Sequence, residues 1–403
     1  MSALFRFILV YAALYGAFGM ASPFMPAFLA GRGLEPQQLG VVLAAGTALR
    51  LISAAAAGPS GDRLQALRAV LTLCLVVAAL ATLAYLPARG FQALFALNLM
   101  QAAALGPVTI LADALALNAA ARPHPGSPGF EYGLVRGTGS GAFVVGTVLS
   151  GQAVGVFGLN AIIWGEAALL AAAAVWTRLV PEAAAPPSAA ETPGEVHHNG
   201  VWSGAMTLLW LPAFRRVVLV ASLILGSHAM HDSFAVIRWS AAGIGPVTTS
   251  LLWSESVVAE VVVFFALGPA VLTRLRPAGA MVLAAAAGIL RWAVLALSAD
   301  VLSFALVEPL HGITFALLHL ACMRLIARLV PGDLAGTGQA IYGTGIGVAT
   351  VALTFLSGVL YERIGAEGFW VMSAVCGLAL PMAIGLRKTI ADGAIASPRP
   401  YAS

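Results

Sequence analysis

Long apolar stretches alternate with short polar or Pro- and Gly-containing turns along almost the whole chain. A helix needs about 20 mostly apolar residues to cross the hydrocarbon core of a bilayer. Twelve stretches come close to or exceed that length. They lie near 5–29, 37–57, 67–87, 91–118, 131–156, 159–180, 216–239, 247–271, 278–298, 301–328, 336–361 and 368–386. The pattern predicts an all-α integral membrane protein with twelve transmembrane helices.

The composition excludes an ordinary soluble protein. Hydrophobic residues make up 60% of the chain and charged residues only 9%, whereas a soluble domain has about 25% charged residues. The net charge of +4 comes from Arg near helix ends, which sets orientation in the bilayer and gives no reason to expect nucleic acid as a partner. Cys74, Cys322 and Cys376 all lie in apolar stretches, so we expect neither disulfides nor a metal site.

One connection is much longer than the others. Residues 181–215 are rich in Ala and Pro and separate six apolar stretches from six more. We therefore expect a six-helix bundle over 1–180, a linker over 181–215, a second bundle over 216–388 and a tail over 389–403. Most Arg residues fall on the side that holds the linker and both termini. That bias predicts a multi-pass protein of the inner membrane with cytoplasmic termini.

The two predicted bundles resemble each other. Gly58-Pro59 after the second stretch matches Gly268-Pro269 after the eighth, and the GTGxG pattern at 137–141 recurs at 343–347. The two matches have nearly the same offset, which indicates a duplicated six-helix unit of two pseudo-symmetric bundles. Such a duplication, with a site between the halves, is typical of secondary transporters.

A polar stripe crosses the tenth stretch. Glu308, His311, Phe315 and His319 fall on one face of a helix that is otherwise apolar. An ionised group at the centre of a membrane helix costs roughly 2.5–3.5 kcal/mol on insertion scales. The stripe should therefore face protein or a water-filled cavity, as substrate sites and proton relays do.

Three further charged positions, Asp232, Glu255 and Arg291, lie at the depth of Glu308 and His311 in this stripe. Asp232, Glu255, Arg291, Glu308 and His311 come from four neighbouring stretches. A carboxyl changes its protonation when a neighbouring cation moves, so these residues form the predicted proton-coupling site. Arg291 is the expected counter-charge and His311 the expected relay.

The identity of the proton carrier stays open at this point among three carboxylates, Glu255, Glu260 and Glu308. Glu260 lies about 140° around the helix from Glu255, so the two do not face one cavity squarely.

A second charged layer occurs in the first half. Arg50, Asp113 and Arg136 lie at similar depths in three predicted helices, and one acid between two guanidiniums suggests an ion-paired cluster. Arg136 either binds an anionic group of the substrate in exchange with Asp113, or forms a permanent pair that locks two helices together. The predicted substrate-binding residues are Tyr11, Tyr15, Asn98, Gln101, Asp113, Arg136, His228, Phe315 and His319.

Several motifs carry a resemblance to a known family. The loop from Gly58 to Arg68, GPSGDRLQALR, resembles the G-x-x-x-D-R signature of the major facilitator superfamily. Three further segments are similar to its lactose-permease-like branch, which contains the phenylpropionate permease and nucleoside–proton symporters. They are 112–115 (ADAL), 131–140 (EYGLVRGTGS) and 310–315 (LHGITF).

The resemblance implies proton coupling in helices eight to ten and an acid–Arg pair in helices four and five. In the lactose permease a His precedes a Glu by one turn, whereas here Glu308 precedes His311. The resemblance also implies a gate at Arg50, Asp62 and Arg63. An Asp62 carboxylate against a helix N-terminus would contribute about 0.3–1 kcal/mol.

We expect a proton-coupled symporter that imports a small organic solute by alternating access. The Arg136 guanidinium and the aromatic lining favour an anion with a ring, so an aromatic acid fits both. Proton-driven efflux is the alternative, and an integral membrane enzyme is a remote one because the sequence offers no H-x-x-x-H pair or Ser-His-Asp set. The expected driving force is a proton gradient without a bound cofactor, in a monomer surrounded by lipid.

Overall fold

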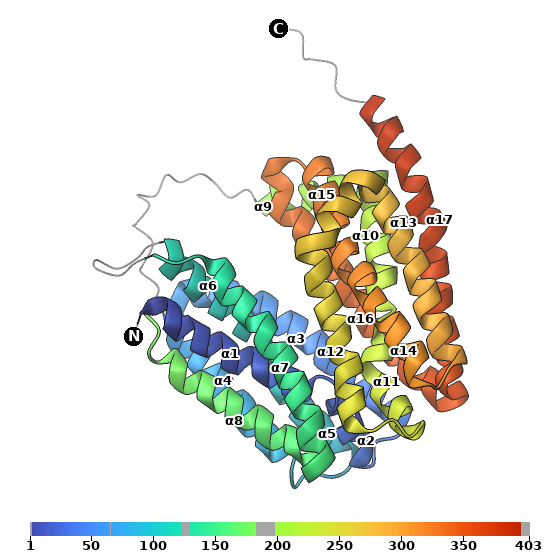
Figure 1. Cartoon of the computed structure of the whole chain (residues 1–403). Helices are drawn as coiled ribbons and strands as arrows, with labels where there is room; N and C mark the ends of the chain where they lie inside the picture. The colour runs from blue at the N-terminus through green and yellow to red at the C-terminus, as the bar shows by residue number, and fades with distance from the viewer. Residues whose placement is uncertain (1, 65, 122–128, 183–197, 396–403) are drawn as a thin grey trace. The chain divides into compact units, whose positions relative to one another are not determined.

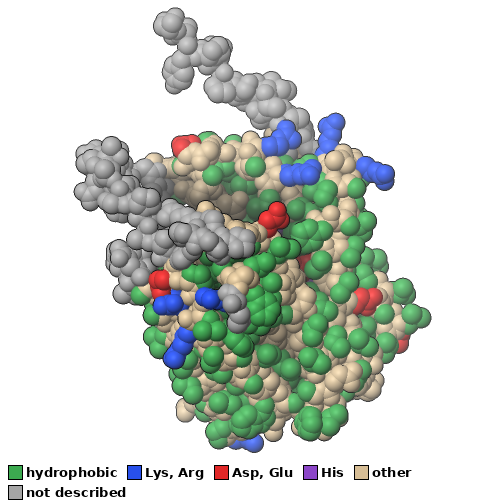
Figure 2. All heavy atoms as spheres, turned by 60° about the vertical axis from the view of Figure 1, so that its left-hand side comes forward, with side chains coloured by type: hydrophobic (Ala, Val, Ile, Leu, Met, Phe, Trp, Pro, Cys, Tyr) green, Lys and Arg blue, Asp and Glu red, His purple; other side chains and the backbone are tan. Residues whose placement is uncertain are grey.

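The computed structural model describes residues 2–64, 66–121, 129–182 and 198–395. Within these ranges the side chains of residues 57–64, 198–202, 387–388 and 390–395 are not described. Every regular element in the described ranges is a helix (Figure 1). Hydrophobic side chains cover most of the face shown in Figure 2, as expected for a surface in contact with lipid.

Eight helices come from the first half of the chain. They are α1 (Ala3–Ala21), α2 (Met25–Gly31), α3 (Pro36–Leu64), α4 (Leu67–Ala84), α5 (Phe91–Leu105), α6 (Val108–Ala121), α7 (Tyr132–Phe157) and α8 (Asn160–Thr177). Two predicted stretches are divided. The first breaks around Pro23, and the fourth breaks at Gly106 and Pro107 because proline lacks the amide donor that a continuous helix needs.

The second half begins with a helix that the sequence pattern did not predict. Helix α9 (His198–Trp210) occupies the last part of the predicted linker, where an apolar run follows the Ala- and Pro-rich stretch. The remaining helices are α10 (Pro212–Gly226), α11 (Ala229–Ala241), α12 (Pro246–Val262), α13 (Gly268–Leu297), α14 (Val301–Val307), α15 (Leu318–Leu329), α16 (Ala335–Ile364) and α17 (Gly368–Ile395).

Helix α14 has a defined start. The Asp300 side chain is its N-cap, with Oδ1 accepting a hydrogen bond from the Ser303 amide at 2.9 Å. Hydrogen bonds from Ser298 and Ser303 lower the pKa of this exposed carboxyl to about 2. The cap is therefore ionised at neutral pH, which suits the positive end of the helix dipole.

The helices agree with twelve membrane crossings. Among the described residues, ten helical runs are long and apolar enough to span a bilayer. Two of them, Pro246–Leu297 and Gly332–Leu386, have 52 and 55 residues, or about 80 Å at 1.5 Å per residue, more than twice a hydrocarbon core of about 30 Å. Each contains one break, at Arg276 (φ 58°) and Gly365 (φ 57°). Each is therefore long enough for two crossings, which is consistent with twelve in all.

The described residues form two compact units. One contains α1 to α8 with residues 232–254 and 354–363, and the other contains residues 198–231, 255–353 and 364–395. In the first unit α1 packs on α7 and α8, and α4 packs on α5 and α8. In the second unit α13 and α10 pack on α17, around a core that includes Phe214, Met281 and Leu318.

Close helix packing in the first unit joins α3 to the end of α16. A Cβ added to Gly40 would approach the Gly358 Cα to 2.8 Å, so only glycine allows this separation. About one helical turn away from the contact, the Gln37 amide donates to Glu362 Oε2 at 2.9 Å. Because Gly40 and Gly358 have no side chains, the two backbones can approach closely, as they do at small residues in many membrane helix pairs.

Gly40→Ala should reduce stability because the new methyl group overlaps the α16 backbone. Overpacking of this kind costs about 1–3 kcal/mol, which thermal unfolding in detergent can measure. Gly155→Ala is the matched control, since a Cβ there meets only a Val247 methyl at 3.9 Å. It should be neutral or slightly stabilising through better helix propensity. Equal effects of the two substitutions would mean that the α3–α16 contact does not form.

Candidate functional site

The tenth predicted helix is irregular where its polar residues lie. After α14 the chain forms a 3-10 turn over Glu308–Leu310 and a π-helix over Gly312–Leu317, before α15 begins. Pro309 supplies no backbone donor, which favours the tight turn. Gly312 allows the π segment to approach α12, since a Cβ there would lie 2.6 Å from the Ala259 carbonyl oxygen. Short π segments frequently occur at functional sites.

A buried ion pair lies at this irregular segment. The side chains of Arg291 and Glu308 are 0% exposed, and Arg291 Nη2 lies 2.5 Å from Glu308 Oε2. Ser256 Oγ donates to the same oxygen at 2.5 Å. His231 Nε2 lies 3.1 Å from Glu308 Oε1. Side chains from α11, α12, α13 and the 3-10 turn thus converge on one carboxylate.

A second histidine extends the cluster toward a less buried acid. Arg291 Nη1 lies 3.1 Å from His311 Nδ1, and because a guanidinium only donates, His311 Nδ1 accepts. His311 Nε2 then faces Glu260 Oε2 at 3.5 Å. The Glu260 side chain is 26% exposed. We call Glu308, Arg291, His311 and Glu260, with His231 and Ser256, the coupling cluster.

Aromatic contacts hold the Arg291 guanidinium in place. It lies 4.6 Å from the centre of the Trp292 ring, whose Nε1 donates to Ser227 Oγ at 2.8 Å. His228 packs against Trp292 and His311, with ring centres 5.3 and 5.0 Å apart. Its buried Nε2 has no hydrogen-bond partner among the described residues, a polar atom for which water or a solute could be a partner.

The structure brings together three of the predicted coupling residues, Arg291, Glu308 and His311. Glu255 is partly buried and makes no ion pair among the described residues. Asp232 is exposed and belongs to the first unit. His228 lies at a break in the seventh predicted stretch, because α10 ends at Gly226 and α11 begins at Ala229.

Sequence reasoning missed two members of the coupling cluster and left a third undecided. His231 and Ser256 were not proposed, and Glu260 was only one of three alternatives. A signal for His231 existed, because any histidine inside an apolar stretch is costly unless it has a partner. Ser256 gave no such signal, since a serine in a membrane helix commonly bonds its own backbone.

In the first unit Asp113 has neutral partners. Tyr11 and Tyr132 both donate to its Oδ1, at 2.5 and 2.8 Å. The expected ion pairs with Arg50 and Arg136 do not occur among the described residues, so a permanent Asp113–Arg136 lock is absent there. The three residues lie at similar depths in the predicted helices, but depth does not determine which way each side chain faces. Asp113 also follows the helix break at Pro107, which the sequence pattern did not include.

The two arginines of this layer instead lie on aromatic rings. The Arg136 guanidinium is 4.9 Å from the Tyr15 ring centre, and that of Arg50 is 5.3 Å from the Phe18 ring centre. Arg136 is exposed and has no ion pair among the described residues. An arginine in a membrane helix without an acidic partner needs water or an anion, so Arg136 is available to a substrate.

One predicted lining residue, Gln101, belongs to an internal polar network. The Gln101 amide donates to Glu166 Oε1 at 3.1 Å and to Thr82 Oγ1 at 2.9 Å, and Tyr85 donates to Gln101 Oε1 at 3.3 Å. Asn98 Oδ1 is buried without a described partner. Gln101 therefore holds helices together in this structure.

The last predicted residues are aromatic neighbours or lie outside the description. Phe315 stacks on His311 with ring centres 5.4 Å apart. The ring of His319 lies near the rings of Phe264 and Tyr342, with distances between ring centres of 6.0 and 6.3 Å. The side chains of the predicted gate residues Asp62 and Arg63 are outside the described residues.

Comparison with known proteins identifies the family. The model of the MFS_1 like family matches residues 4–372, which is most of the chain. The chain belongs to the MFS_1 like family. This confirms the resemblance to the major facilitator superfamily seen in the sequence motifs, and it places the protein among multi-pass membrane transporters of small molecules rather than among enzymes.

Individual MFS_1 like and related proteins agree with this assignment. The chain is 31% identical over 387 residues to the "Probable 3-phenylpropionic acid transporter" of Escherichia coli, covering 92% of this chain and 94% of that relative. Its fold is similar to that of a mutant form of the nucleoside transporter NupG, with a TM-score of 0.82 and 15% identity. The match covers 96% of this chain and 100% of the NupG chain. The fold is also similar to that of the POT family transporter PepTSo, with a TM-score of 0.71 and 12% identity. The match covers 98% of this chain and 99% of PepTSo.

Breaking the Arg291–Glu308 pair in this MFS_1 like protein should be strongly destabilising. Glu308→Ala or Arg291→Ala leaves an unpaired charge at a fully buried position, at a cost of about 3–5 kcal/mol in the free energy of unfolding. The double variant Arg291→Met with Glu308→Leu should recover most of that loss because no charge remains. Glu367→Ala, at an exposed turn, is the control and should change stability by less than about 0.5 kcal/mol. If both single variants are as stable as the wild type, water reaches the pair.

Proposed function

We propose that this protein is a proton-coupled symporter that imports a small aromatic carboxylate by alternating access. The observation that carries the proposal is the coupling cluster, a fully buried carboxylate–guanidinium pair continued by His311 to the partly exposed Glu260. Ionisable residues at membrane depth cluster in proton pathways of transporters.

In the proposed cycle Glu308 carries the proton. While Arg291 and Ser256 contact Glu308 Oε2, the carboxylate is satisfied in its ionised form. When a rearrangement separates it from Arg291, a carboxyl in apolar surroundings takes up a proton rather than hold an unpaired charge. Glu260 passes the proton to His311, and His311 delivers it to Glu308 only after the guanidinium of Arg291, which now contacts His311 and cannot itself relay a proton, has moved away.

In the same proposal the first unit recognises the substrate. Arg136 binds the carboxylate through its two-pronged guanidinium, and Tyr15, which already lies against Arg136, packs on the ring. Asp113 does not compete for the guanidinium because Tyr11 and Tyr132 satisfy it. The printed name of the Escherichia coli relative refers to 3-phenylpropionic acid, which has such a carboxylate and ring.

The remaining expectations complete the proposal. The proton gradient drives uptake without a bound cofactor, and a monomer in the inner membrane is the working unit. The bundles are placed at 1–180 and 216–388, with the linker and both termini on the cytoplasmic side. The Arg distribution supports the orientation through the positive-inside rule.

Proton movement in vesicles tests the proposal directly. Purified protein is reconstituted in vesicles, and the external pH is recorded while an inward gradient of 3-phenylpropionate, a nucleoside or a sugar is applied. Symport of the carboxylate should make the external solution alkaline, and this solute alone should do so. Acidification would indicate that protons leave the vesicle as the solute enters, which is antiport. Proton-driven loss of preloaded solute would favour efflux.

The same preparation separates proton coupling from solute binding. Glu308→Gln keeps hydrogen bonding but cannot ionise, so it should abolish proton-driven accumulation and leave exchange of labelled for unlabelled solute intact. Glu367→Gln makes the same change at an exposed turn and should leave both intact. If Glu308→Gln still accumulates solute, Glu308 is not the carrier; if it folds but loses exchange as well, Glu308 has a structural role.

Arg136→Lys should weaken substrate binding selectively. Lysine keeps the charge and loses the two-pronged contact, so the apparent dissociation constant for 3-phenylpropionate should rise at least about tenfold, or about 1.4 kcal/mol. Equilibrium exchange at varied solute concentration measures this constant. Arg363→Lys, exposed at the end of α16, should leave it unchanged. An unchanged constant in Arg136→Lys would rule out the carboxylate clamp.

A further inference from the structure

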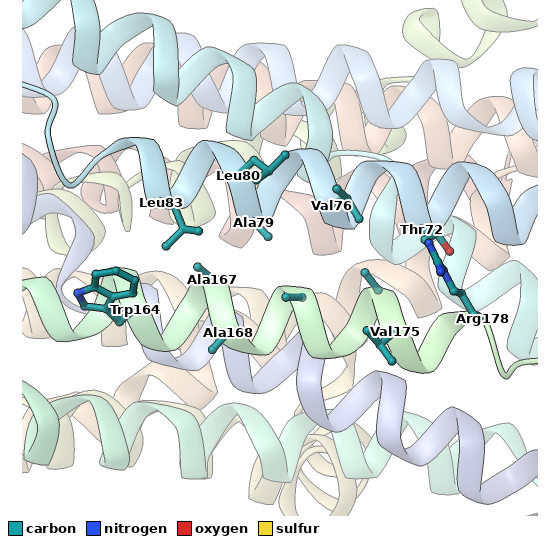
Figure 3. Close-up of a pocket in the computed structure, with 12 residues that line it drawn as sticks. Thr72, Val76, Ala79, Leu80, Leu83, Trp164, Ala167, Ala168, Val175 and Arg178 are labelled. Carbon is teal, nitrogen blue, oxygen red and sulfur yellow. The ribbon is translucent and has the colours of Figure 1, made fainter.

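A long apolar groove runs between α4 and α8 in the first unit. Its volume is about 510 Å³, within the range of cavities that hold small ligands. Figure 3 shows α4 and α8 side by side, with Trp164 at one end of the groove and Thr72 and Arg178 at the other. None of the residues of the candidate functional site lines this groove.

The groove exists because one wall is made of alanines. Ala168 and Ala171 of α8 are both exposed and face the larger Val76 and Leu80 of α4 across the groove. From Trp164 to Arg178 the helix rises about 21 Å, against a hydrocarbon core of about 30 Å. A single acyl chain can therefore lie along it.

The end of the groove at Arg178 is positively charged. A second hollow of about 520 Å³ continues from it and is lined by both Arg68 and Arg178. Arg68 is neutralised by Glu182, with Nε 3.0 Å from Oε2, and its Nη1 also donates to the Val180 carbonyl at 3.1 Å. Arg178 is exposed and has no ion pair or side-chain hydrogen bond among the described residues. The local net charge of these three side chains is therefore positive, and the free cation is Arg178.

We propose that this groove binds one anionic phospholipid, with an acyl chain along the alanine wall and the phosphate on Arg178. An apolar trough that ends in a single unpaired cation matches a molecule with a hydrocarbon chain and an anionic head. Basic pockets between membrane helices are known to select acidic headgroups. The Arg-rich side of the chain places this head in the predicted cytoplasmic leaflet. A free anion would gain nothing from the trough, and a zwitterionic lipid would gain less from Arg178 because its ammonium group offsets the charge of its phosphate.

The headgroup is tested by native mass spectrometry of the full chain with phosphatidylglycerol or phosphatidylethanolamine of the same acyl chains. The wild type should bind phosphatidylglycerol about fivefold more tightly, the effect of one basic residue at a membrane surface. Arg178→Gln should remove that preference. Arg215→Gln, which changes an exposed arginine on the same predicted side but outside the groove, should retain it. A wild type without the preference, or an unchanged preference in Arg178→Gln, would overturn the proposal.

The acyl chain is tested by filling the groove. Ala171→Phe should lower the retention of phosphatidylglycerol at least as much as Arg178→Gln does, because the ring occupies the place of the chain. Ala96→Phe, at an exposed position of α5, is the matched control and should bind as the wild type does. Both alanines are exposed, so folding is preserved and melting temperatures verify this. Full retention in Ala171→Phe, or equally tight binding of inorganic phosphate alone, would also overturn the proposal.

Discussion

The burial of a guanidinium and a carboxylate at one fully enclosed position constrains the helices around it in the second unit. Neither Arg291 nor Glu308 is stable there alone, and their mutual attraction repays desolvation only when further hydrogen bonds complete the geometry. Ser256 and His231 supply those bonds from two other helices. Because apolar residues of the same size would cost less, the pair is expensive as a structural device. Its presence at membrane depth is better explained by chemistry than by stability.

The acids of the two units have different kinds of hydrogen-bond partner. In the first unit Asp113 has tyrosine hydroxyls and Glu166 an amide as partners, so neutral donors replace cations. In the second unit the acid Glu308 is paired with a cation. The consequence is that Arg136 stays free of acids among the described residues, whereas Arg291 is fully engaged. A cation that is free suits binding of an anionic solute, and one that is engaged suits control of a proton.

Hydropathy and the cost of buried charge predicted a large part of this arrangement. The apolar stretches gave the crossings, and the rarity of charge within them pointed to Arg291, Glu308 and His311. What could not be predicted is rotation about each helix axis. A π segment over Gly312–Leu317 changes the 100° phase on which the stripe from Glu308 to His319 relied. His319 accordingly contacts Phe264 and Tyr342, and the expected Asp113–Arg136 pair failed because depth alone did not determine facing.

The proposed coupling requires that a proton does not reach Glu308 equally from both sides of the membrane, and the burial of this carboxylate is consistent with that requirement. Glu308 is wholly buried, and its three neighbours Arg291, Ser256 and His231 are each buried as well. Within the described residues the contacts of the cluster continue outward through His311 to Glu260, the more exposed end at 26%. A path that leads to one carboxylate on one side makes protonation depend on conformation. In the proposed transport cycle, that dependence would make the buried ion pair a means of coupling.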